Sequence, residues 1–226
     1  MNTGAENHQR KIYFISGLGA DWRMFQFLEL PQDLPYEHVE WIAPLSVQES
    51  LQQYAQRLKA QITASQPILI GLSFGGLMAI ELAKLLQPYK LIIISSLATS
   101  AALPWYYRLL GNLKLQRYVP LKLLQSFLPL APFFFGAHSP AEKKLLREVI
   151  LDINELYLRW SLEKLLTWRH EKPLPNLYQI HGTADKVLPL RRRPGMYIVE
   201  GGEHLMVMRR ASEISKILHQ ILIENA

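Results

Sequence analysis

The segment GLSFG, residues 71–75, places Ser73 midway between two glycines. A short apolar run, residues 67–71, precedes the serine, and a helical pattern begins at Phe74. A tight turn from a strand into a helix strains the serine backbone and projects its hydroxyl, while the glycines let neighbouring backbone approach. We therefore predict that Ser73 is a nucleophile with helix amides facing any negative charge that develops beside it. The alternative, a glycine-rich phosphate turn, lacks its usual lysine.

A serine hydroxyl reacts readily only when a base removes its proton and an acid orients that base. Only Asp185, of the four aspartates, directly follows a late strand-like run, in HGTADKVLP. His204 lies further along the chain in GGEHL, between the last strand-like run and the last helical pattern. In an open α/β sheet, residues that follow strands meet at one edge. We therefore predict a catalytic triad of Ser73, Asp185 and His204.

Two neighbouring residues offer alternatives for the base and the acid. His181 ends a strand-like run, where a buried, hydrogen-bonded structural histidine is the simpler interpretation. Glu203 precedes His204 directly, but adjacent side chains rarely point at one another. The remaining histidines are weaker candidates and lie in the N-terminal tail, an early strand, the long helical segment and the last helix: His8, His38, His138, His170 and His219.

The oxyanion of an acyl-transfer intermediate needs two hydrogen-bond donors. The Phe74 amide is the first candidate, and the Leu18 amide, in the glycine-containing segment SGLGAD at residues 16–21, is the second. A dinucleotide-binding loop is the alternative for this segment, but the third glycine and the distal acid of that motif are missing.

Short apolar runs bounded by turn residues are typical of buried parallel strands. They occur at residues 11–16, 36–43, 67–71, 90–95 and 176–180, with a weaker sixth run at 195–199. Helical patterns alternate with them at residues 47–65, 74–86 and 214–223. This alternation predicts an α/β protein with a mostly parallel, doubly wound sheet of about six strands.

The alternation stops between residues 101 and 170, where the sequence reads as leucine-rich and aromatic helices punctuated by proline. We predict an inserted, all-helical cap over residues 101–170 and a core built from residues 1–100 and 171–226. Its aromatic side chains should line an apolar pocket above the nucleophile. The candidates for this lining include Trp105, Tyr106, Phe134 and Trp160.

The cap carries ten Lys and Arg against five Asp and Glu, which accounts for most of the chain's net charge of +6. Within residues 101–135, Arg108, Lys114, Arg117 and Lys122 occur without any acid. A solvated cap surface is the simplest interpretation, and weak contact with an anionic membrane or an acyl carrier is the alternative. No pattern of a nucleic-acid-binding module accompanies the charge, so we expect no nucleic-acid partner.

The 226 residues contain no cysteine, which excludes thiol catalysis, disulfides and cysteine-ligated metals. The first residues lack the apolar stretch of a signal peptide, and no run approaches the ~20 apolar residues of a membrane span. We therefore expect a cytoplasmic protein. We expect neither a metal nor a cofactor, and the oligomeric state stays open.

Four segments together resemble the α/β-hydrolase superfamily: SGLGAD, GLSFGG, HGTADKVLP and GGEHL. The chain looks like a compact member that lacks the first two strands of the family, with Ser16-Gly17 where many members have His-Gly. The resemblance implies hydrolysis through an acyl-enzyme, and we expect a small-molecule carboxylic ester or thioester of small to medium acyl length as substrate. The alternatives are carbon–carbon bond hydrolysis or lyase chemistry on a carboxylated substrate, and a binding protein without activity.

Overall fold

The computed structural model describes residues 10–114 and 128–223. Its strands form one six-stranded sheet in the order β2-β1-β3-β4-β5-β6, and every neighbouring pair is parallel. The strands are β1 (Arg10–Ile15), β2 (Tyr36–Val39), β3 (Gln66–Leu72), β4 (Lys90–Ile94), β5 (Leu177–Gly182) and β6 (Met196–Val199). The structure and the family match reported below confirm the predicted α/β fold class.

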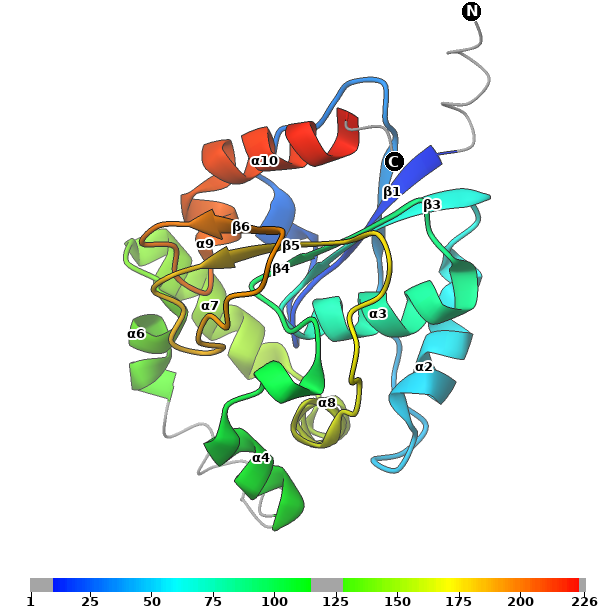
Figure 1. Cartoon of the computed structure of the whole chain (residues 1–226). Helices are drawn as coiled ribbons and strands as arrows, with labels where there is room; N and C mark the ends of the chain where they lie inside the picture. The colour runs from blue at the N-terminus through cyan, green and yellow to red at the C-terminus, as the bar shows by residue number, and fades with distance from the viewer. Residues whose placement is uncertain (1–9, 115–127, 224–226) are drawn as a thin grey trace, which may run out of the picture.

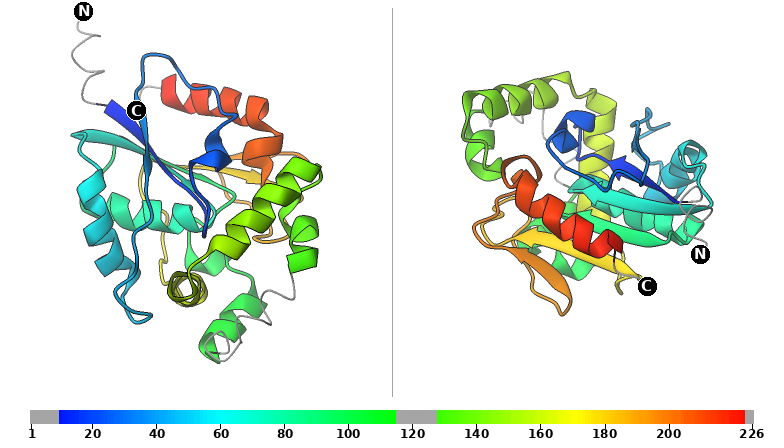
Figure 2. Two further views of the ribbon diagram at one scale, coloured as in Figure 1. Left: turned by 180° about the vertical axis from the view of Figure 1, so that it is seen from behind. Right: turned by 90° about the horizontal axis from the view of Figure 1, so that it is seen from above.

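Helices cover both faces of this sheet, as Figures 1 and 2 show, with α10 on one face and α2 and α3 on the other. The 3₁₀ turns are labelled η. The described helices are η1 (Trp22–Phe25), α2 (Leu51–Leu58), η2 (Lys59–Gln61), α3 (Phe74–Leu86), η3 (Ser100–Ala102), α4 (Trp105–Asn112), η5 (Leu128–Leu130), α6 (Ala131–Phe135), α7 (Pro140–Asp152), α8 (Glu155–Thr167), α9 (Met206–Arg209) and α10 (Ala211–Ile223).

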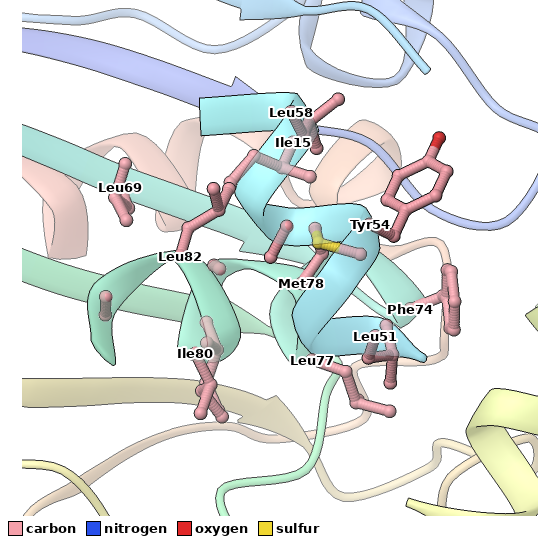
Figure 3. Packing of buried hydrophobic residues seen from close by; sticks show 14 of the residues in the cluster. Ile15, Leu51, Tyr54, Leu58, Leu69, Phe74, Leu77, Met78, Ile80 and Leu82 are labelled. Carbon is pink, nitrogen blue, oxygen red and sulfur yellow. The ribbon is translucent and has the colours of Figure 1, made fainter. Parts of the chain in front are cut away.

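The sheet has a hydrophobic cluster on each face because successive strand side chains point to opposite sides. In β3, Leu69 joins the cluster under α2 and α3, whereas Ile68 and Ile70 join the cluster under α10. Figure 3 shows Leu51 and Tyr54 among the side chains of the first cluster. A strand buried on both faces reads as a continuous apolar run, which explains why β3 and β4 were predictable.

Two predicted elements are shorter in the structure than the sequence suggested. The helix predicted for residues 47–65 begins at Leu51, where Ser50 and Gln53 form a capping box, and η2 ends it. The strand predicted for residues 36–43 ends at Val39, its last residue paired with β1. The chain then leaves the sheet, which frees Trp41 to reach the loop after β1.

Between β4 and β5, the described residues 101–114 and 128–170 form helices and no strand. Helix α8 packs beside α3, whereas α4 lies further from the sheet (Figure 1). Arg117 and Lys122 of the predicted basic face lie outside the described residues. In the described ranges, no helix is both long and apolar enough to cross a lipid bilayer. The division into a core and a cap remains our proposal.

Candidate active site

Ser73 stands between β3 and α3 with a left-handed backbone, φ 53° and ψ −120°. A non-glycine residue seldom adopts such angles, and surrounding contacts must hold it there. Its amide donates to the Ile94 carbonyl at 2.9 Å, and its carbonyl accepts the Ser96 hydroxyl at 2.6 Å. The end of β4 and the residues after it therefore fix the turn that carries Ser73.

The two glycines around Ser73 allow backbone segments to touch. A Cβ on Gly71 would lie 2.4 Å from the Gly75 carbonyl oxygen, and a Cβ on Gly75 would lie 2.2 Å from the carbonyl oxygens of Ile15 and Ser16. No side chain fits at either position. The start of α3 is thereby pressed against the end of β1, which brings the loop after β1 next to Ser73.

We expect Gly75→Ala to lower the free energy of unfolding by about 3 kcal/mol, because the new methyl group meets backbone that cannot turn aside. The gain in helix propensity, about 1 kcal/mol, does not offset this cost. Urea denaturation measures the effect. Gly17→Ala is the matched control, since its Cβ would sit 3.6 Å from the Ser73 Cβ, an ordinary contact. Equal stability of the two variants would contradict the close approach.

The structure brings the three predicted triad residues together in one hydrogen-bonded chain. The Ser73 Oγ lies 2.9 Å from His204 Nε2, and His204 Nδ1 lies 2.8 Å from Asp185 Oδ2. The side chains of His204 and Asp185 are 2% and 0% exposed, so the contact is shielded from solvent. The other carboxylate oxygen, Oδ1, accepts the amides of Val187 and Leu188 at 2.9 and 2.8 Å, which fixes the orientation of Asp185.

His181 lies beside the hydrogen-bonded triad but is not part of it. Its Nε2 is 2.8 Å from the Leu188 carbonyl oxygen, to which it donates, and 3.5 Å from Asp185 Oδ2. Burial lowers the pKa of His181 below 6.5, and the opposing effects of Asp185 and the Leu188 carbonyl do not cancel that. The structure therefore gives His181 the buried, hydrogen-bonded position expected of a structural histidine.

This lowered pKa predicts a pH dependence of stability. Below pH 6.5 the unfolded chain binds a proton at residue 181 that the folded chain resists, so the free energy of unfolding falls as the pH falls. The slope for one proton reaches at most about 1.4 kcal/mol per pH unit. Urea denaturation at pH 7.5 and 5.5 should show a smaller loss for His181→Gln than for the wild-type chain. An equal loss would exclude His181 as the cause.

The segment SGLGAD forms the loop after β1 and lies against the serine. Its conformation is fixed by Ser16, whose hydroxyl donates to the Ala20 carbonyl at 2.5 Å and accepts the indole N–H of Trp41 at 2.9 Å. Leu18 is half-buried in this loop, and Phe74 is the first residue of α3, where amides have no partner within the helix. The oxyanion role of the Leu18 and Phe74 amides stays a prediction.

An aromatic group that the sequence did not single out surrounds this loop. The Trp41 ring packs against Phe74 and Tyr157, with ring centroids 5.7 and 5.6 Å away. Trp41 lay inside a predicted strand, and Tyr157 was one of many apolar positions in a long helical segment, so neither had a sequence signal. The structure places both beside Phe74 or its neighbour, next to the turn that carries Ser73.

The predicted cap aromatics differ in burial. Trp105, Tyr106 and Phe134 are 65%, 39% and 45% exposed, and a pocket-lining role for them stays a prediction. Trp160 is fully buried. Its indole N–H donates to the Glu49 carbonyl at 2.7 Å, and its ring lies 4.3 Å from that of Tyr54. This differs from the pocket-lining position that we expected, because α8 packs with Trp160 directed against Tyr54 of α2.

Glu203, the residue before His204, contacts polar side chains from three different segments. Glu203 Oε2 accepts His138 Nε2 at 2.6 Å and an Arg209 N–H at 2.9 Å, and its Oε1 lies 3.6 Å from Lys186. Burial acts to raise the pKa of Glu203, but the His138 hydrogen bond and the two cations hold it below its ordinary value. Glu203 faces away from the hydrogen-bonded chain, which leaves Asp185 as the acid beside His204.

We expect Glu203→Gln to lower kcat/KM about tenfold, because the loop that carries His204 loses its ion pairs and a small misplacement of a base is costly. Hydrolysis of a p-nitrophenyl ester is the measurement. Glu200→Gln is the matched control, since the Glu200 side chain is exposed and pairs with Arg192 at 3.6 Å. The same kcat/KM in both variants would contradict a positioning role for Glu203.

Among the described residues, no group of three or more His, Asp and Glu side chains is arranged to hold a metal ion. The arrangement can transfer a proton from a serine hydroxyl to an imidazole whose second nitrogen is held by a carboxylate. Phe135 closes one side of the imidazole, with its ring 5.3 Å away at 80°.

Comparisons with known proteins agree with this geometry. No curated protein matches the chain in sequence. Solved structures are similar over 95% of this chain and 92% of theirs. These include an esterase from Exiguobacterium antarcticum (15% identity, TM-score 0.66), a hydrolase from Oleispira antarctica (16%, 0.68) and an enol-lactonase from Burkholderia xenovorans LB400 (16%, 0.65). The model of the alpha/beta hydrolase family matches residues 12–216, so the chain belongs to the α/β-hydrolase family.

Proposed function

We propose that this chain is a serine hydrolase that cleaves carboxylic esters or thioesters of small to medium acyl length through an acyl-enzyme. The observation that carries the proposal is the hydrogen-bonded chain from Ser73 through His204 to Asp185. Similarity to structures of an esterase and an enol-lactonase supports it, because a lactone is a cyclic ester.

The first half-reaction forms the acyl-enzyme. Asp185 accepts the Nδ1–H of His204, which leaves the lone pair of Nε2 free to take the Ser73 proton. As that proton moves, Oγ bonds to the substrate carbonyl carbon. The resulting oxyanion accepts hydrogen bonds from the backbone amides of Leu18 and Phe74. The intermediate collapses when the bond to the leaving oxygen or sulfur breaks. The imidazolium then gives its proton to the departing alcohol or thiol.

The second half-reaction uses the same groups with water as the nucleophile. His204 Nε2 removes a proton from water, and the hydroxide oxygen bonds to the acyl carbon. Collapse of the second tetrahedral intermediate breaks the bond to Oγ, and the imidazolium returns a proton to Ser73. The products are a carboxylic acid and a free serine, so every proton is accounted for without a cofactor.

Covalent labelling tests the proposal directly. A fluorophosphonate should label the chain, and peptide mass spectrometry should place the label on Ser73. Activity on panels of p-nitrophenyl esters and thioesters of increasing acyl length should then exceed that on carboxylated dienes and β-diketones. Labelling with turnover of only the carbon–carbon substrates would replace ester hydrolysis by that chemistry. A folded protein that takes no label at Ser73 would contradict both and leave a binding protein.

A further inference from the structure

A cavity of about 400 Å³ lies beside the carboxyl ends of β4 and β5. Its walls come from three places: residues 96–102 after β4, β5 with the connection to β6, and Arg108 of α4. This volume falls in the range of small-molecule sites, about 300–1,000 Å³. None of the proposed triad residues lines it, so the cavity is a separate feature.

The cavity exists because the β5–β6 connection lacks a crossover helix. Parallel strands are usually joined through a helix that packs on the sheet, but residues 183–195 contain none. On this face β5 presents Gln179 and His181, two residues apart, whereas Ile180 points into the cluster under α10. Polar side chains thus face the space that a helix would otherwise cover.

The charge of the cavity wall is entirely positive among its described lining residues. Arg108, Arg191, Arg192 and Arg193 line it, and no Asp or Glu does. Arg192 reaches outward to Glu200 at 3.6 Å, where both side chains are well exposed. Within residues 10–114 and 128–223, Arg108 and Arg191 form no ion pair that would neutralise them. Clustered guanidinium groups repel one another, and a bound anion would relieve that repulsion.

One of the four arginines is held in place by the floor of the cavity. Arg193 Nε donates to Gln179 Oε1 at 2.9 Å, and Gln179 Nε2 donates to the Ser96 carbonyl at 2.8 Å. A guanidinium that is oriented in advance loses little conformational freedom when it binds a planar or tetrahedral anion. This hydrogen-bonded series distinguishes the cavity from a surface where mobile cations meet by chance.

Two residues that line the cavity also contact the proposed catalytic residues. Ser96 donates its hydroxyl to the Ser73 carbonyl, and His181 Nε2 lies 3.5 Å from Asp185 Oδ2. His181 is 2% exposed, and because its Nε2 donates to Leu188, its Nδ1 is an acceptor, which has no hydrogen-bond partner in the structure. A buried acceptor without a partner is costly, and a water molecule in the cavity could donate a hydrogen bond to it.

We propose that this cavity is a binding site for the carboxylate or phosphate group of a small anionic ligand. Arg108 and Arg191 supply cations without ion-pair partners in the described ranges, Arg193 supplies an oriented donor, and α4 and the β5–β6 connection place them around one space. Guanidinium groups bind both kinds of anion through paired hydrogen bonds. The proposal concerns binding and does not depend on the hydrolytic reaction.

The test is an NMR titration of the ¹⁵N-labelled full chain with inorganic phosphate, succinate and acetate. Backbone amides of residues 96–102 and 191–193 should shift with a dissociation constant below about 10 mM for phosphate or succinate. Raising the salt concentration should weaken the binding. Phosphate alone, succinate alone or both binding there would each support the site and identify its anion. No saturable shift at these residues with any of the three would overturn it.

The variant Arg108→Gln/Arg191→Gln should weaken anion binding at least roughly tenfold, since both side chains are exposed and their loss leaves the fold intact. Lys143→Gln/Arg147→Gln on α7 removes the same charge from exposed positions outside the cavity and should bind as the wild type does. Equal weakening in both variants would mean an unspecific charge effect and would overturn the site. Ser73→Ala should bind anions as the wild-type chain does. A failure of the hydrolase proposal can therefore be distinguished from a failure of the anion site.

Discussion

Ser73→Ala should lower kcat for ester hydrolysis about a million-fold. The hydroxyl is the atom that attacks, and no other side chain within hydrogen-bond reach of His204 Nε2 replaces it among the described contacts. The residual rate would come from substrate binding and the backbone donors. Steady-state kinetics with a p-nitrophenyl ester measures the loss, and circular dichroism with a thermal melt shows that the variant is folded.

Ser95→Ala is the matched control for this variant. Ser95 also follows a strand at the same edge of the sheet, and its φ of 48° is close to that of Ser73. Its hydroxyl is buried and has no hydrogen-bond partner in the structure. We expect kcat near the wild-type value. If both variants lost activity equally, or if Ser73→Ala kept esterase turnover, the acyl-enzyme mechanism would be wrong.

Asp185→Asn should lower kcat about ten-thousand-fold without unfolding the chain. The asparagine carbonyl can still accept the amides of Val187 and Leu188, so the loop keeps its shape. Its NH₂ group, however, would donate to His204 Nδ1 and drive the proton to Nε2. An imidazole in that tautomer cannot accept the Ser73 proton.

Measuring kcat at several pH values separates this effect from a simple loss of fold. Asp152→Asn, which changes an exposed carboxylate at the end of α7, removes the same charge and should keep full activity. A loss smaller than about a hundredfold in Asp185→Asn would show that another group orients His204. Glu203 would then need to be tested as that group.

The sequence predicted the sheet and the positions of the three candidate residues because both depend on local signals. Gly71 and Gly75 indicate the turn around Ser73 because an apolar run precedes them and a helical pattern follows, and a strand buried on both faces is visible as an apolar run. Asp185 and His204 each follow a strand, so the parallel topology brings them to the same edge. These features need no knowledge of distant contacts.

Other features depend on contacts between remote segments and had no local signal. Trp41 leaves its predicted strand because β1 ends at Ile15, the residue that pairs with Val39. The His138–Glu203 contact joins residues 65 positions apart. Trp160 reads as an ordinary aromatic residue in a helix, and only the packing of α8 on the core decides which way it faces. Hydrophobic periodicity reports the buried side of a helix but not its neighbour.

Helices α7 and α8, which lie between β4 and β5 in the chain, pack on opposite sides of the sheet. Leu146 and Val149 of α7 belong to the cluster under α10, whereas Tyr157 and Trp160 of α8 belong to the opposite cluster. Lifting α7 and α8 together as a rigid lid would therefore expose both halves of the hydrophobic interior at once. We therefore expect α7 and α8 to stay packed on the sheet and to unfold together with it.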